Sequence, residues 1–184
     1  MTETTPYEVT GTAGKAELRR YPPMVLATVQ DAGDDRGFGK LFKYISGSNR
    51  ARNTIPMTAP VITSERIPMT APVITSSSIP MTSPVISGAG TMSFVMPAGR
   101  TLDQVPEPTD ERVRIETVPA REVAVVRFSG HAHRHDVEAV AARLHEELGK
   151  AGIATRGTPF LMRYNAPYTP GFLRRNEVGV EIQR

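Results

Sequence analysis

Short runs of alternating apolar and polar residues occupy the first part of the chain, and they predict β-strands. Alternation is seen in residues 7–10 and 16–20, and residues 24–29 form a nearly continuous apolar run that contains β-branched residues. Glycines within residues 11–14 separate the first two runs, and two prolines at 22–23 precede the third. We therefore expect three strands before the first helix.

A helical period of apolar residues follows these strands. Four of them recur at the spacing of one helix face, namely Phe38, Leu41, Phe42 and Ile45. Asp34 or Asp35 can cap the start of this helix, and Gly47 can end it. The spacing predicts a helix that buries this face.

The second half of the chain shows the same succession of patterns. A second helix is predicted over about residues 136–148, and Gly149 or Gly152 can end it. Its apolar stripe consists of Val137, Val140, Ala141, Leu144 and Leu148. Strands are expected over residues 112–118, 121–128, 160–164 and 177–182.

The two halves also resemble each other in sequence. Residues 21–29 (YPPMVLATV) and 118–126 (VPAREVAVV) each precede a predicted helix by roughly ten residues. An internal duplication of a strand-strand-helix-strand unit explains this likeness, and chance is the alternative. Strands in runs with two helices predict an α+β fold with a mainly antiparallel sheet.

A nine-residue phrase occurs three times at a spacing of twelve, at residues 55–63, 67–75 and 79–87. If the phrase forms a strand, Pro56 and Pro60 leave the missing N–H groups on one edge. This predicts an edge strand, or one beside an irregular neighbour. We interpret the extra copies as an inserted hairpin; a β-solenoid is the rival interpretation.

Composition limits the domain organisation and the classes of function. A chain of 184 residues fits one domain, here residues 7–184, after a polar tail at 1–6 that we expect to be disordered. The absence of cysteine excludes disulfides, thiolate metal sites, covalently attached haem and cysteine nucleophiles. Without a signal peptide or a long apolar run, we expect a cytoplasmic protein that does not span a membrane.

Charge adds little to this picture. Lysine and arginine number 22 against 19 acidic residues, and the net charge of +3 is scattered along the chain. We therefore expect no nucleic-acid partner.

Three alternate histidines stand where a strand passes into the second helix. His131, His133 and His135 are candidate metal ligands, because alternate residues share one face of a strand. The alternative is a solvated helix entry with a capping role. The acidic residues Glu107 and Asp110 lie in a proline-rich stretch typical of a surface loop. Nothing in these patterns requires an enzyme.

The chain resembles the SOUL family of haem-binding proteins. The motifs that carry the resemblance include GFGKLFKYISGSNRA, the MTAPV phrase, MSFVMP and YNAPYTPGFLRRNEVGVEI, and together they extend from residue 7 to residue 182 in order. The resemblance implies an α+β domain with a curved antiparallel sheet or distorted β-barrel, two helices and two similar halves. Relatives commonly carry one or two copies of the phrase, so the third is a departure.

The same resemblance implies non-covalent binding of haem or another porphyrin in an apolar groove between the first helix and a late loop. In this chain the groove maps onto residues 40–47 and 168–175. Apolar walls and cations for the carboxylates of the porphyrin would come from Lys40, Leu41, Phe42, Lys43, Tyr44, Ile45, Tyr168, Phe172, Leu173, Arg174 and Arg175. Core packing is the alternative role for the helix stripe. Tyr44, Lys40 and Lys43 lie off that stripe and discriminate best between the two roles.

Three functions remain open from the sequence. The first is reversible tetrapyrrole binding in a carrier or buffering role. The second is a domain that senses or hydrolyses another small molecule, since the duplicated fold resembles ligand-binding domains of regulators. The third is an interaction module whose proline-rich hairpin docks onto a protein partner of unknown identity.

Overall fold

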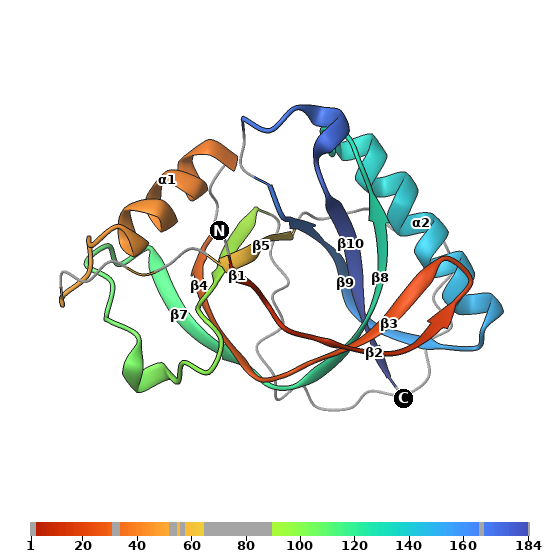
Figure 1. Cartoon of the computed structure of the whole chain (residues 1–184), viewed down its shortest axis with the longest axis horizontal. Helices are drawn as coiled ribbons and strands as arrows, with labels where there is room; N and C mark the ends of the chain where they lie inside the picture. The colour runs from red at the N-terminus through yellow and green to blue at the C-terminus, as the bar shows by residue number, and fades with distance from the viewer. Residues whose placement is uncertain are drawn as a thin grey trace.

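The computed structural model describes residues 3–30, 34–51, 55, 58–64, 90–165 and 168–183. Within them, the strands form one curved sheet, and the two α-helices lie outside it (Figure 1). The helices are α1 (Asp34–Ile45) and α2 (Arg134–Lys150), and short 3-10 helices are η1 (Leu102–Gln104) and η2 (Gly171–Leu173). The strands are β1 (Glu3–Thr4), β2 (Glu8–Ala13), β3 (Ala16–Tyr21), β4 (Met24–Val29), β5 (Thr58–Ser64), β6 (Thr91–Val95), β7 (Val113–Val118), β8 (Arg121–Phe128), β9 (Ala154–Arg163) and β10 (Asn176–Gln183).

The strand order of the sheet is symmetric about its centre. It runs β2-β3-β8-β10-β9-β5-β6-β4-β7, with antiparallel neighbours throughout this path. Strands at equal distances from the β9–β5 pair correspond to one another: β10 corresponds to β6, β8 to β4 and β3 to β7. The first strand of each such set of strands pairs with the other half, because β3 pairs with β8 and β7 pairs with β4. This order is the one that two copies of one unit produce, although the internal repeat itself stays a prediction.

The sheet is curved but not closed. In the described part of the chain its two end strands, β2 and β7, do not pair with each other. The α+β fold and the curved antiparallel sheet are therefore confirmed, whereas these strands do not form a closed barrel. None of the described helices combines the length and the apolar character that crossing a membrane requires.

Both helices pack on the convex face of the sheet (Figure 1). The predicted stripe of α2 is confirmed: Leu144 and Leu148 are fully buried against Leu18, Ala124 and other residues of β3, β8, β9 and β10, and Val140 is partly buried. The apolar residues that α1 buries are Leu41, Tyr44 and Ile45, together with the partly buried Phe38.

The predicted buried stripe of α1 is wrong at two residues. Phe42 is half exposed, and Tyr44, which we placed off the stripe, is buried. The helix is rotated so that its buried side centres on Leu41, Tyr44 and Ile45. The hydroxyl of Tyr44 donates a hydrogen bond to the carbonyl of Pro106 at 2.7 Å, which permits the burial of this polar group.

The concave face of the sheet is covered as well. Its core includes Tyr21, Leu26, Val123, Phe160 and Met162, and among the described residues neither helix contributes to it. Because both faces are covered, all six residues of β4 are buried. The opposite faces of one strand thus serve two separate cores.

The first copy of the repeated phrase provides β5, and the prediction of an edge strand is wrong for it. β5 pairs with β6 on one side and with β9 and β1 on the other. The pairing of β5 with β6 shifts register between Thr58 and Val61, and the extra residues lie in β5 itself, so the irregularity belongs to this strand and not to its neighbour β6. The second and third copies lie outside the described residues.

The N-terminal segment that we expected to be disordered contributes to the sheet over its described part. β1 pairs with β5 in parallel, and the backbone N–H of the buried Thr5 donates to the carbonyl of Ala59 at 2.8 Å. The hydroxyl of Thr5 donates to the same carbonyl at 3.0 Å.

The predicted strands 24–29 and 121–128 are observed with the expected bounds, and β9 begins six residues before its prediction.

Candidate functional site

The residues of α1 that we named as site candidates separate into two groups. Leu41, Tyr44 and Ile45 are buried beneath the helix against β4 and β6, so they hold the helix on the sheet. Burial raises the pKa of Tyr44 to about 12, which keeps its hydroxyl a donor at neutral pH. Lys40, Phe42 and Lys43 are half-buried or exposed and form the accessible side of the helix.

The late loop presents three large apolar side chains to solvent within the part the structure describes. Tyr168 is 90% exposed, Phe172 80% and Leu173 61%. Arg174 follows them, and its Nε donates to the carbonyl of Thr169 at 2.7 Å. The loop therefore combines an exposed apolar surface with an adjoining cation.

This loop is attached to the junction between β8 and α2. The backbone N–H of Gly130 donates to the carbonyl of Gly171 at 3.2 Å, and Asn176 Nδ2 donates to the carbonyl of Gly130 at 2.9 Å. The ring of His131 lies so close to Gly171 that a Cβ there would overlap it. Arg174 Nη1 lies 3.5 Å from Nδ1 of the same histidine. Figure 1 shows η2 beside the start of α2, while α1 lies on the other arm of the sheet.

The three histidines stack as a row at this junction. The ring centroids of His131 and His133 are 5.7 Å apart, and those of His133 and His135 are 5.8 Å apart. His133 occupies the N-cap position of α2, although its side chain makes no capping hydrogen bond. Across the described residues no group of three or more histidine, cysteine or acidic side chains is arranged to hold a metal ion.

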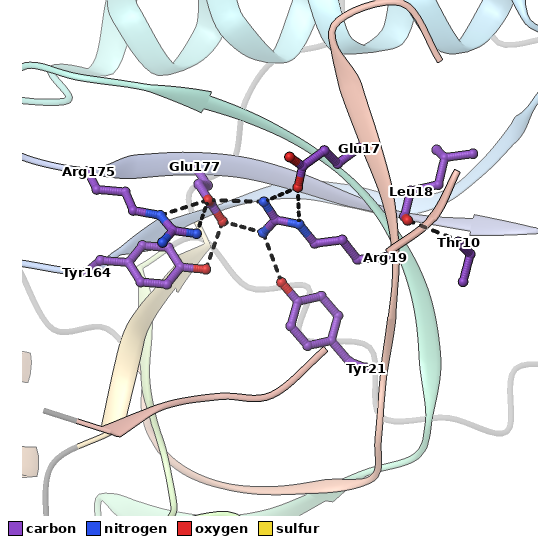
Figure 2. Close-up of polar contacts among 8 residues, drawn as sticks. All are labelled: Thr10, Glu17, Leu18, Arg19, Tyr21, Tyr164, Arg175 and Glu177. Carbon is purple, nitrogen blue, oxygen red and sulfur yellow. Dashed lines mark hydrogen bonds and ion pairs between the residues drawn. The ribbon is translucent and has the colours of Figure 1, made fainter. Parts of the chain in front are cut away.

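A buried polar network on the concave face was missed by the sequence analysis (Figure 2). Arg19 of β3 donates through Nη1 to Glu177 Oε2 at 2.6 Å and through Nη2 to Glu17 Oε2 at 2.6 Å. Glu177 also accepts from the hydroxyl of Tyr164 at 2.7 Å and from Arg175 Nη2 at 2.7 Å. Two cations thus balance two carboxylates.

The electrostatics of this network favour the charged forms of its central pair. Burial alone would raise the pKa of Glu177, but hydrogen bonds from Arg19, Tyr164 and Arg175 outweigh it and lower that pKa below its usual value. Burial raises the pKa of Tyr164, so this residue stays a donor. All the polar atoms of the pair are occupied by partners, and the network holds strands together instead of offering a reactive group.

The predicted acidic cluster is a set of surface ion pairs. Glu107 Oε2 lies 2.9 Å from Arg50 Nη1, and both side chains are largely exposed. Asp110 Oδ1 accepts from Arg112 Nε at 2.9 Å. This arrangement matches the surface loop expected from the surrounding prolines.

A porphyrin does not fit the cavity on the concave face. The volume of that cavity is about 10 Å³, room for about one water molecule, whereas pockets for drug-sized ligands span about 300–1,000 Å³. Exposed apolar side chains are found instead on two separate elements, Phe42 on α1 and Tyr168, Phe172 and Leu173 on the late loop. That a tetrapyrrole binds between these elements stays a prediction.

Solved structures with the same fold are distant in sequence. The C-terminal domain of EcmrR has a TM-score of 0.56 at 10% identity, with 97% of this chain and 98% of that chain covered. A hydrolase from Listeria innocua has a TM-score of 0.60 at 10% identity, with 92% of each chain covered. At this identity the likeness concerns the fold alone.

Sequence comparison gives a more specific result. No curated protein matches the chain. The model of the SOUL heme-binding protein family, however, matches residues 2–181, nearly the whole length, and the chain therefore belongs to this family.

Proposed function

We propose that this protein binds haem or a related tetrapyrrole reversibly, against the exposed side chains of the late loop and of α1, in a carrier or buffering role. The observation that carries the proposal is the exposure of Tyr168, Phe172 and Leu173 on a loop that backbone hydrogen bonds attach to the domain. A contiguous exposed apolar surface is unfavourable in water and is typical of a binding surface. A tetrapyrrole ring would cover it.

The two arginines beside this surface differ in the partners that orient them. Arg174 is oriented by Thr169 and His131 next to the exposed residues, so it is suited to a propionate. Arg175 is committed to Glu177 and stacks over the ring of Tyr164 at 4.2 Å. We therefore expect Arg174, with Lys40 and Lys43 of α1, to contribute more to binding than Arg175.

Binding through these residues is non-covalent, since the chain has no cysteine for a thioether bond. When bound, a haem supplies its conjugated ring and its iron. The protein residues cover the ring and pair with its carboxylates. Recognition of the ring and of the propionates implies that iron-free protoporphyrin also binds, within about tenfold of the affinity for hemin.

The test is a titration of the purified protein with hemin, followed by the Soret band. We expect a shift that saturates near one equivalent, and weaker binding in Phe172→Ala, Lys43→Ala and Arg174→Ala. The chain offers a matched control: Leu173 and Leu102 both lie on 3-10 helices and are 61% and 55% exposed. Leu173→Ala should weaken binding and Leu102→Ala should not. A shift that never saturates, or one indifferent to all of these substitutions, rejects the proposal.

A further inference from the structure

The end strand β7 has one edge to which no described strand is paired. It is the last strand of the sheet (Figure 1), and within the described residues β4 is the strand that pairs with it. The register with β4 is unbroken over the whole of β7. At the other end of the sheet, the register of β2 is shifted between Val9 and Gly11. A regular strand edge, unlike a bulged one, is able to accept a further strand.

The backbone of β4 shows which groups of β7 face this edge. The carbonyl of Val25 accepts from the N–H of Met96, the residue after β6, at 2.8 Å, so the polar groups of Val25 face β6. Val25 is opposite Thr117 in the antiparallel register. Opposite residues point their polar groups either toward each other or away from each other. Thr117 therefore points its N–H and C=O to the outer edge, and Ile115 does the same because the direction alternates along a strand.

The side chains of β7 carry opposite charges at alternate positions. Arg114 is exposed and Glu116 is half-buried, and within the part of the chain that the structure describes neither forms an ion pair. Being two residues apart, they point to the same face of the sheet. If a second copy adds its β7 antiparallel, with Ile115 opposite itself, Arg114 of each copy lies opposite Glu116 of the other. The charges of the strand are thus complementary to those of its own copy.

Hydrogen bonding and charge together select this register. Outward-facing residues must be opposite each other to form backbone hydrogen bonds, which excludes a two-fold axis between two residues. An axis at residue 114 would place Arg114 opposite its own copy, and an axis at residue 116 would do the same for Glu116, so both bring like charges together. With the axis at Ile115, this residue exchanges both hydrogen bonds with its copy, and Thr117 donates to the carbonyl of Val113.

We propose that β7 is a self-association surface, and that two copies of this chain join their sheets through antiparallel β7 strands around a two-fold axis at Ile115. A contact of this kind stops at two copies, because each edge occupies the other. β7 lies on the arm of the sheet that α1 covers, whereas η2 of the late loop lies beside α2 on the other arm (Figure 1). The dimer is therefore independent of the proposed tetrapyrrole binding.

Sedimentation equilibrium of the full chain without hemin tests the proposal, at protein concentrations from about 1 μM to about 1 mM. We expect a reversible monomer–dimer equilibrium. Arg114→Glu and Glu116→Arg each bring like charges together, twice in every dimer, so each should weaken the association about tenfold or more. The matched control is Glu8→Arg, a charge reversal at an exposed position of the other end strand, which should leave the association unchanged.

Combined variants test the register. Arg114→Glu/Glu116→Arg exchanges the two charges and should restore the association. An equimolar mixture of the two single variants should form a mixed dimer, because one variant is acidic at both positions and the other is basic at both. Thr117→Pro removes an outward N–H but no hydrogen bond to β4, so it should abolish the dimer while circular dichroism shows a folded domain.

Four results would overturn the proposal. The first is a chain that stays monomeric up to about 1 mM. The second is an association that neither charge reversal weakens, and the third is a folded Thr117→Pro variant that still dimerises. The fourth is a failure of both the exchanged double variant and the mixture of single variants to associate.

Discussion

Arg19 and Glu177 are 158 residues apart in the chain, yet Arg19 Nη1 lies 2.6 Å from Glu177 Oε2 and both side chains are buried. Their strands, β3 and β10, do not pair, because β8 lies between them. The ion pair therefore connects the two strands across β8 on the concave face (Figure 2). Four further partners, Glu17, Tyr21, Tyr164 and Arg175, complete the hydrogen bonding of the pair.

The first prediction concerns acid stability. The pKa of Glu177 is lowered in the folded protein from an ordinary value of 4.5. The unfolded chain thus binds the proton more readily, and the contribution of Glu177 to the free energy of unfolding is complete above about pH 4.5. This contribution should be lost as the pH falls through the lower, folded-state pKa. Urea unfolding of the unmodified protein and of Glu177→Gln should show a difference in the free energy of unfolding that is largest near neutral pH and becomes smaller in acid.

The control for this experiment is Glu8→Gln, because Glu8 is exposed and its distance from Arg20 is 3.7 Å. Its effect should be small at every pH. If the difference in the free energy of unfolding between Glu177→Gln and the unmodified protein stayed constant across the acid range, Glu177 would not be the titrating group.

The second prediction compares neighbouring arginines of β3. Arg19→Met leaves the buried Glu177 with fewer partners and should lower the free energy of unfolding by about 3–5 kcal/mol. Arg20→Met removes an exposed pair with Glu122 and should cost less than about 1 kcal/mol. Denaturant midpoints and slopes of the two variants measure the difference. Equal losses would contradict the buried network.

The third prediction concerns the helix α1. Tyr44→Phe removes the hydrogen bond to Pro106 but keeps the ring, so it should cost about 1 kcal/mol of stability. The pKa of Tyr44 is raised to about 12 in the folded protein. This stabilisation is complete below pH 10 and is lost as the pH rises toward about 12.

An absorbance titration of the phenolate checks this pKa. The difference in phenolate absorbance between the unmodified protein and Tyr44→Phe should develop near the upper end of the range from pH 10 to about 12. An absorbance difference with its midpoint at pH 10 would instead place Tyr44 in solvent.

The fourth prediction uses two glycines in opposite surroundings. Gly39 lies in α1, and an added Cβ meets nothing within 4 Å, so Gly39→Ala should stabilise the protein by up to about 1 kcal/mol. At Gly179 of β10, an added Cβ would lie 3.0 Å from side-chain atoms of Met162 and Val123. Gly179→Ala should therefore destabilise by about 1–3 kcal/mol. Melting temperatures that move in the same direction would contradict this account.

Several elements could be predicted from the sequence because they depend on local patterns. β4 and β8 were predicted from apolar runs with β-branched residues, and the stripe of α2 from helical spacing. For α1 the same spacing fits two overlapping faces, one with Phe42 and one with Tyr44. The choice depends on the carbonyl of Pro106, 62 residues away, which accepts the hydrogen bond that makes burial of a tyrosine hydroxyl favourable.

The candidate site also combines features that the sequence shows with features that depend on the tertiary structure. The aromatic residues of the late loop and the absence of cysteine could be identified in the sequence, and they support the prediction that a tetrapyrrole would bind non-covalently. Whether the named residues of α1 and of the loop bind together stays a prediction for the hemin titration. The small cavity of the concave face had no sequence signal, because its wall combines side chains of six separate strands and the N-terminal segment.

The sequence by itself determined where strands and helices lie and which strand positions share a face. It did not determine which face is covered. On β3 and β10 the apolar residues Leu18, Val178 and Val180 pack against α2, and the opposite face carries Arg19 and Glu177. Alternation alone assigns that charged face to solvent. The curvature of the sheet instead brings distant strands around it, and only this tertiary arrangement buries the charges and pairs them.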